Sequence, residues 1–381
     1  MDKRNRKIKS ILLILKEPFL DRIPSLKTLI MFLAENGIQV SIITSESKKF
    51  TVNSFSHKNI FFYKVKERST LFELPTSIKV YIKSLLFSFT HKIDYIIGGD
   101  SIGNIISSRL CSLLGKKHIN FQLEYPQIIT EKHPFLNRLQ KLENKAIEKS
   151  SYIITHDKWH KQFLLEHFKL NKDSILLLPN SSFTPEVCIN SNFLQERLNI
   201  SNKRIVLHSG GFGKWFKCKE LAESTESWND NIKLVFHISH KLEGDPYFET
   251  IYQTNYGGKV LYSLNPVSTF ELDKLVASAD IGIALYSEKD LGYRATYMGL
   301  AAGKIGNYLK CGVPVIATKL PSLTYIEEYQ CGILIECEKD IANAINVIIS
   351  NRNMYSENAY RCYRELWYPE TYLSIIQKEL L

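Results

Sequence analysis

The segment RATYMGLAAGKIGNYLKCGVPVIATKLP, residues 294–321, determines how the rest of the chain is interpreted. Small residues occupy most of positions 299–303, before a short expected helix, and Lys304 falls in the first turn of that helix. A cation at this end opposes the helix dipole, and it is tolerated best where an anion lies between it and the helix N–H groups. The segment therefore predicts a phosphate-binding site. After the helix, the turn at 311–314 leads into an apolar strand at 315–318.

The pattern K-x-x-x-Y-L-x-C-G-x-P-V-I-A-T, followed closely by Leu-Pro, resembles the donor-site segment of GT-B glycosyltransferases. The resemblance implies an α/β fold of two Rossmann-like domains that face each other across a cleft, with a nucleotide-sugar bound by the second domain. Two positions depart from the family pattern, because Asn307 and Gly299 stand where acidic residues are usual. The resemblance implies that the following residues of the segment bind the donor: Arg294, Gly299, Leu300, Ala301, Gly303, Lys304 and Asn307.

A second candidate phosphate site is the glycine-rich turn at 210–213, which follows an expected buried strand at 204–209. Its three glycines let the backbone approach an anion closely. The turn is not a Walker loop, because Trp215 rather than Ser or Thr follows Gly213-Lys214. In GT-B enzymes the equivalent loop lies beside the donor diphosphate, and a lysine near its end supplies charge. The implied donor-binding residues are Gly210, Gly211, Gly213, Lys214 and Lys217.

The length of 381 residues suits two domains, and strands alternate with helices along the whole chain. We expect an acceptor-binding domain at 1–182 and a nucleotide-sugar-binding domain at 183–364. Residues 365–381 are predicted to form a separate helix. By the resemblance, that helix packs back on the first domain.

Candidate catalytic groups should follow the strands of the first domain, because ligands of parallel sheets bind outside the strand carboxyl ends. This rule selects four acidic residues that come directly after expected strands. Each of them is also suited to a plain helix-capping or loop role. They are Glu17, Asp21, Asp100 and Glu124.

The first 180 residues contain 29 Lys and Arg against 16 Asp and Glu, whereas the remainder contains 20 against 23. The basic half suits an anionic membrane surface, a phosphate-bearing acceptor or nucleic acid, although a lysine-rich soluble surface gives the same count. No nucleic-acid-binding module is recognisable, so nucleic acid is not an expected partner. The helix expected at 78–89 is amphipathic and carries Lys79 and Lys83. Such a helix usually packs on a sheet, and the alternative is an interfacial membrane contact.

Seven cysteines at irregular spacings, with no C-x-x-C pair, indicate free thiols in a reducing compartment. The apolar stretch at 11–15 is shorter than the core of a signal peptide, and no stretch is long enough for a membrane span. We therefore expect a cytoplasmic protein, at most peripheral to the inner face of the membrane.

His156 and His160 have the i, i+4 spacing of a zinc-binding helix, but Asp157 is too short for the general-base role and no third ligand is evident. We expect a surface helix there and no metal site. No nucleophile elbow is present. No cofactor is expected beyond the nucleotide-diphosphate sugar, which is a substrate.

Together these features predict a metal-independent hexosyl- or related transferase. Its acceptor would be a glycan, or a glycan linked to a lipid diphosphate, in cell-surface polysaccharide biosynthesis. Two alternatives stay open, namely a sugar-nucleotide epimerase of the same fold and a non-catalytic transferase-like scaffold. The scaffold is kept open by the missing acidic residues at Gly299 and Asn307.

Overall fold

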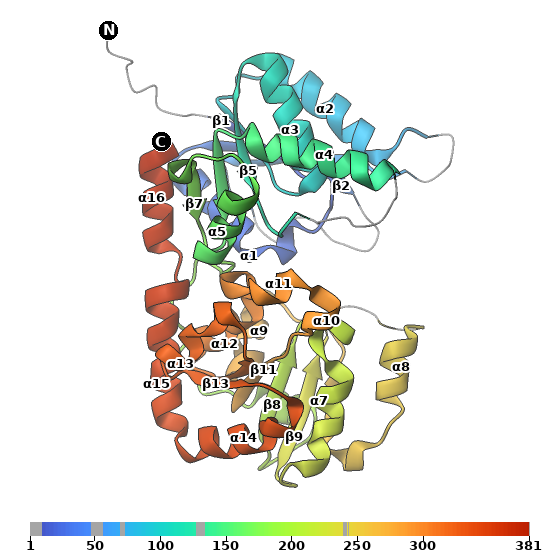
Figure 1. The fold of residues 1–381 in the computed structure, drawn as a ribbon, viewed down its shortest axis with the longest axis vertical. Coiled ribbons are helices and arrows are strands. Elements are labelled where there is room, and N and C mark those ends of the chain that lie inside the picture. Colours follow the sequence, from blue (N-terminus) through green and yellow to red (C-terminus); the bar gives the residue numbers. More distant parts are fainter. Residues whose placement is uncertain are drawn as a thin grey trace. The chain divides into compact units, whose positions relative to one another are not determined.

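The computed structural model describes residues 10–46, 56–68, 73–126, 134–238, 242 and 244–380, without the side chains of Asp21, Thr269 and Phe270. The chain divides into two compact units (Figure 1). Unit 1 comprises Met1–Phe183 and Pro369–Leu381, and unit 2 comprises Thr184–Tyr368. The division therefore returns to unit 1 at residue 369, four residues after the start expected at 365.

Unit 1 is built on a parallel sheet of seven strands in the order β3-β2-β1-β4-β5-β6-β7. Its central strands β1 and β4 are largely apolar and buried, as expected for a parallel sheet covered on both faces. The strands are β1 (Ser10–Ile14), β2 (Gln39–Glu46), β3 (Ile60–Lys66), β4 (Tyr95–Gly98), β5 (Lys117–Phe121), β6 (Tyr152–Thr155) and β7 (Ile175–Leu177).

Helices cover both faces of this sheet. The last helix of the chain and α1 pack on one face, and α2 and α3 pack on the other. The helices of unit 1 are α1 (Pro24–Glu35), α2 (Thr76–Thr90), α3 (Ser101–Leu114), α4 (Pro134–Glu148), α5 (Lys158–His167) and α16 (Glu370–Leu380).

Unit 2 repeats the same design with six parallel strands in the order β10-β9-β8-β11-β12-β13. The strands are β8 (Arg204–Ser209), β9 (Ile232–His237), β10 (Val260–Ser263), β11 (Ile281–Ala284), β12 (Val315–Thr318) and β13 (Gly332–Ile335). In both units the chain reverses its direction of winding beside the first strand, which is the order of a doubly wound Rossmann-like sheet. The predicted α/β fold of two Rossmann-like domains is confirmed.

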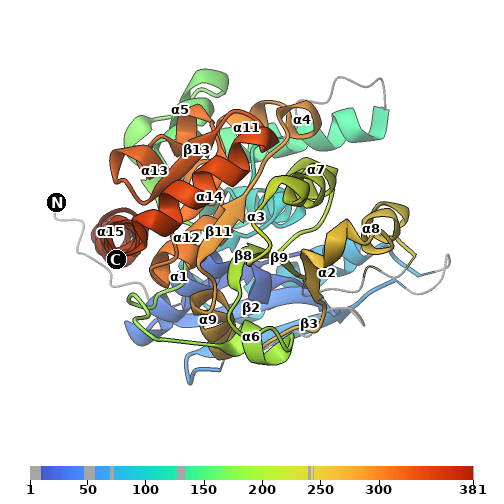
Figure 2. The same ribbon diagram turned by 90° about the horizontal axis from the view of Figure 1, so that it is seen from below.

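The helices of unit 2 also form two layers, with α9 and α12 on one face of the sheet and α7, α8 and α14 on the other (Figure 2). They are α6 (Phe193–Arg197), α7 (Cys218–Ser224), α8 (Pro246–Tyr252), α9 (Thr269–Ala277), α10 (Glu288–Leu291), α11 (Tyr293–Thr296), α12 (Gly303–Lys310), α13 (Tyr325–Glu328), α14 (Ile341–Ser350) and α15 (Arg352–Cys362). A π-helical turn, Tyr363–Trp367, follows α15.

Helix α12 is fixed to the sheet by the buried side chain of Tyr308. Its hydroxyl donates to the carbonyl of Leu207 at 2.9 Å and accepts from the Ser209 N–H at 2.8 Å, both near the end of β8. The Tyr308 ring lies where a Cβ on Gly282 would stand, and the ring of Trp367 closes on Gly306 in the same way. These close contacts place the first turn of α12 next to the carboxyl end of β8.

Within the described residues, no helix is both long and apolar enough to cross a membrane.

Candidate functional site

The two glycine-rich segments singled out in the sequence lie next to each other in unit 2. Gly210 begins the turn after β8 with φ at +115°, which favours glycine, and its N–H donates to the carbonyl of His237 at 3.0 Å. A Cβ on Gly210 would stand 3.9 Å from Cε of Lys304 on α12. Both lie beside β8 and β11, where the strand order reverses, which is the usual ligand position in doubly wound sheets.

Lys304 is the central charge of this site. Its ammonium lies 3.8 Å from the centre of the Phe216 ring and 3.5 Å from Nε2 of His208. Within the described part of the chain, no carboxylate lies within ion-pair distance of it. Burial lowers the pKa of Lys304 to about 8. An amine that is desolvated without a carboxylate is a candidate to bind an anion.

His208 keeps a neutral ring beside this charge. Its Nε2 lies 2.8 Å from the carbonyl oxygen of Gly211, so this nitrogen carries the proton and donates. Burial and then the Lys304 ammonium hold the pKa of His208 well below its ordinary value. The imidazole therefore fixes the glycine turn without adding a second charge.

Only some of the backbone N–H groups at residues 299–303 are available to a ligand. The N–H of Gly299 donates to Oγ of Ser322 at 3.0 Å, and those of Ala301 and Ala302 close a 3₁₀ turn. The N–H groups of Gly303 and Lys304, at the start of α12, have no hydrogen-bond partner among the described residues. These two N–H groups and the Lys304 ammonium are therefore the groups of this site that are available to an anion.

Gly299 occupies its position for a backbone reason. Its φ is +46°, in the left-handed region that other residues enter at a cost of about 1–2 kcal/mol. The acidic residue that is usual here in the GT-B pattern would be strained in this turn. The presence of glycine instead of an acidic residue at position 299 thus follows from the local backbone conformation.

Asn307 lies one turn beyond Gly303 on α12, on the same side of the helix as Lys304. Its side chain is half-buried, and its amide has no hydrogen-bond partner among the residues described. The amide is therefore available to a ligand that the start of α12 holds.

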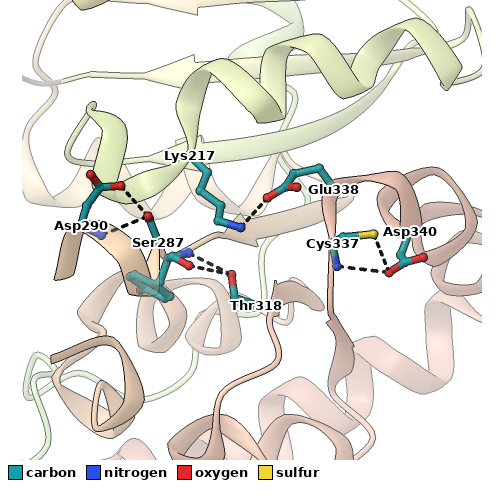
Figure 3. A network of polar contacts seen from close by, with 8 residues as sticks. Lys217, Ser287, Asp290, Thr318, Cys337, Glu338 and Asp340 are labelled. Atoms are coloured by element: carbon teal, nitrogen blue, oxygen red, sulfur yellow. Dashed lines mark hydrogen bonds and ion pairs between the residues drawn. The ribbon is translucent and has the colours of Figure 1, made fainter. Parts of the chain in front are cut away.

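Lys217, the other predicted phosphate lysine, is engaged by a carboxylate. Its ammonium lies 2.6 Å from Oε1 of Glu338, in the loop after β13, and Figure 3 shows the two side chains pointing at each other. A pocket of about 630 Å³ opens beside this pair at the carboxyl ends of β11, β12 and β13. Ser287 and Thr318 line it, and the Thr318 hydroxyl accepts from the Tyr286 N–H at 2.9 Å. An incoming anion would have to compete with Glu338 for Lys217.

The other residues predicted to bind the donor are exposed, half-buried or packed within the fold. Lys214 is exposed at the start of a 3₁₀ turn, and Arg294 is half-buried in the four-residue helix α11. The side chain of Leu300 belongs to the hydrophobic core. Gly211 and Gly213 lie directly against the rings of Phe216 and Trp215, so their role is close packing of the turn.

The three proposed catalytic carboxylates of unit 1 follow the adjacent strands β1, β4 and β5. Asp100 caps α3, because its two oxygens accept from the N–H groups of Gly103 at 2.6 Å and Glu17 at 2.8 Å. Burial raises its pKa to about 6. The Glu17 side chain forms an ion pair with Lys16, and Glu124 is exposed. Both oxygens of Asp100 are thus occupied in fixing the start of α3 and the loop after β1, and Glu124 is the most accessible of the three carboxylates. The side chain of Asp21 is outside the described set.

Helix α5 has an exposed outer side, as expected of a surface helix, but the rings of His156 and His160 are both buried. His156 lies between the carbonyls of Leu178 and Leu123, and His160 stacks on Tyr125 with ring centres 3.7 Å apart. Asp157 caps α5 by accepting from the His160 N–H. The two rings are core residues of unit 1. No group of three metal-ligating side chains occurs in the described regions.

Three residues of the site were not selected from the sequence, namely His208, Phe216 and Glu338. A signal existed for His208, which is a polar residue at the end of an apolar strand, two positions before the glycine turn. Glu338 gave no such signal, because it is 121 residues from its partner.

Comparison with known proteins gives a consistent picture of the fold. No family model matches the chain. The chitobiosyldiphosphodolichol beta-mannosyltransferase of Debaryomyces hansenii is 20% identical over 256 residues, which cover 62% of this chain and 53% of that protein. The protein of the same name from Candida albicans is 24% identical over 204 residues, or 50% of this chain and 43% of that protein. The chain thus spans about half the length of these curated relatives.

Solved structures align over almost the whole chain. HepE of Anabaena, in complex with UDP and glucose, has a TM-score of 0.71 at 13% identity and covers 98% of this chain and 99% of its own. Sucrose-phosphate synthase of Thermosynechococcus elongatus has a TM-score of 0.71 at 13% identity, with coverage of 97% and 98%. At this level of identity the likeness concerns the fold. The chain has the fold of the GT-B glycosyltransferases.

Proposed function

We propose that this chain is a glycosyltransferase that uses a nucleotide-diphosphate sugar as donor. The observation that carries the proposal is the half-buried Lys304, which lies beside Gly210 and beside two N–H groups at the start of α12 that have no partner among the described residues. A site of this kind suits a diphosphate. HepE was solved with UDP and glucose, and the curated relatives are mannosyltransferases, which supports a nucleotide-sugar and a glycan acceptor.

Sugar transfer breaks the bond between the anomeric carbon and the diphosphate, so negative charge grows on the leaving phosphate. Lys304, Lys217 and the N–H groups of Gly303 and Lys304 would stabilise that charge. Asn307 would hydrogen-bond the ribose hydroxyls in place of the usual carboxylate. Because lysines supply the positive charge, we propose that the reaction needs no metal ion, and activity should survive a chelator.

We further propose that the acceptor is a glycan on a lipid diphosphate, in the assembly of a cell-surface polysaccharide at the cytoplasmic face of the membrane. The basic first 180 residues and the name of the curated relatives support this choice. Glu124 is the group of unit 1 that we propose to contact the acceptor, with Glu17 and Asp100 arranging the loops near it.

Calorimetric titration with UDP-, GDP-, dTDP- and CMP-linked sugars tests the donor class. One of them should bind saturably, and the absence of binding across the panel would contradict the proposal. A bound donor incubated without acceptor separates a transferase from an epimerase, because only an epimerase converts the sugar to an isomer. Failure to bind any donor, together with co-purification of a second transferase, would identify a scaffold.

A further inference from the structure

Helix α2 of unit 1 carries apolar side chains on two opposite faces. Its inner face packs against the sheet through Val80 and Phe87, which are buried. Its outer face carries four exposed apolar side chains at spacings of four, four and three residues, which places them in one stripe. Their exposed fractions are 43% for Ile78, 41% for Ile82, 62% for Leu86 and 67% for Phe89. A contiguous exposed stripe of this kind indicates an interaction surface.

The same outer face is basic. Helix α2 contains no acidic residue, and Lys79 and Lys83 line a shallow pocket of about 500 Å³ beside Ile82 and Leu86. The Lys79 ammonium lies 2.6 Å from Oε2 of Glu73, in the segment before the helix, so Lys83 is the helix's available charge. The Lys83 ammonium donates to the carbonyl of Lys64 at 2.7 Å, and no carboxylate of the described residues forms an ion pair with it. Residues 56–94, which include the helix and the edge strand β3, contain seven Lys and Arg against three Asp and Glu.

We propose that the outer face of α2 binds an anionic lipid surface. The stripe from Ile78 to Phe89 enters the boundary between headgroups and acyl chains, and Lys83 extends its ammonium group to the lipid phosphates. Figure 1 shows α2 running beside α3 as a helix of the unit's outer layer. Lipid binding by this face needs no donor and no catalysis, so it is independent of the proposed activity.

The charge of the surface favours a membrane over a second copy of the chain. A symmetric pair of α2 helices would bring Lys83 of one copy close to Lys83 of the other, and like charges oppose that contact. An anionic bilayer offers both an apolar layer and a complementary charge.

Co-sedimentation of the full chain with vesicles tests the proposal. The chain should bind vesicles of phosphatidylcholine mixed with phosphatidylglycerol, should bind phosphatidylcholine alone much more weakly, and should lose binding as salt is raised. Ile82→Glu should lower the partition coefficient at least about tenfold, because it places a carboxylate in the apolar stripe. Ile375→Glu is the matched control, since Ile375 is a helical isoleucine of 50% exposure on α16.

Two results would overturn the proposal. One is vesicle binding that Ile82→Glu and Ile375→Glu leave equally unchanged. The other is a dimer in light scattering that Ile82→Glu dissociates, which would assign the face to a second copy. Both variants should keep the wild-type circular dichroism and donor affinity, because neither residue lies in the donor site.

Discussion

Lys304 is the residue on which donor binding depends most directly, because no carboxylate among the described residues offsets its charge. Lys304→Ala should weaken binding of the nucleotide-sugar by about 1–3 kcal/mol, the value of a charge-assisted hydrogen bond. Calorimetry measures the change. Lys233→Ala is the control, because Lys233 is near the amino end of β9, away from the site, and donates to the carbonyl of Gly258. Equal affinities of the two variants would exclude a donor role for Lys304.

The pH dependence of donor binding tests the same residue independently. Because burial lowers the pKa of Lys304 to about 8, the free protein loses this charge as pH rises through that value. The donor phosphates stay ionised, so affinity should be about tenfold lower at pH 9 than at pH 7. Lys304→Arg keeps its charge over this range and should show a flat profile. A flat profile in the wild type would contradict the assignment.

Glu338 is expected to restrain donor binding, because its carboxylate holds Lys217 at 2.6 Å. Glu338→Gln should free the lysine and tighten donor binding up to about fivefold, the upper range for a partly exposed ion pair. In the Lys217→Ala background the same substitution should have no effect. A tightening that persists without Lys217 would show that Glu338 acts through another contact.

At the scale of the elements, α12 is held to β8 by one hydroxyl. Tyr308→Phe leaves the Ser209 N–H and the Leu207 carbonyl without their buried partner, which should cost about 1–3 kcal/mol of unfolding free energy. Tyr252→Phe removes a hydroxyl from a ring that is 48% exposed and should be neutral within about 0.5 kcal/mol. Urea denaturation compares the two variants, and similar losses would refute the anchoring role.

Long apolar strands and well-capped helices could be predicted from the sequence. The S-x-x-E pattern from Ser268 to Glu271 predicts a capping box, and it is present, with Oγ of Ser268 accepting from the Glu271 N–H at 3.2 Å. The four-residue helices α10 and α11 could not be predicted, because one turn carries no measurable period.

The candidate site was predictable where a local motif encodes it. The small residues before α12 and the turn at 210–213 both carry such a motif, and these two segments meet. The pairing of Lys217 with Glu338 was not predictable, because contacts between distant side chains leave no periodic trace. Burial of His156 was missed because a polar pair at helical spacing gives no sign of which face is covered.

At the scale of the whole molecule, the chain ends in the unit in which it began. Helix α16 follows unit 2 in sequence, yet Leu373, Ile376 and Leu380 belong to the core cluster of unit 1. The hydroxyl of Tyr152 also donates to the carbonyl of Glu379 at 3.3 Å. Unit 1 is therefore complete only when the last helix is in place.

Adjacent isoleucines of α16 allow this dependence to be measured. Ile376 is 1% exposed and Ile375 is 50% exposed, so the two differ in burial but not in chemistry. Ile376→Ala should lower the stability of unit 1 by about 2–5 kcal/mol through the cavity it leaves, and Ile375→Ala should have little effect. Differential scanning calorimetry distinguishes the units, because the transition that Tyr308→Phe lowers belongs to unit 2. If Ile376→Ala lowers that transition instead, or if both alanine variants act alike, α16 does not stabilise unit 1 in the way its packing indicates.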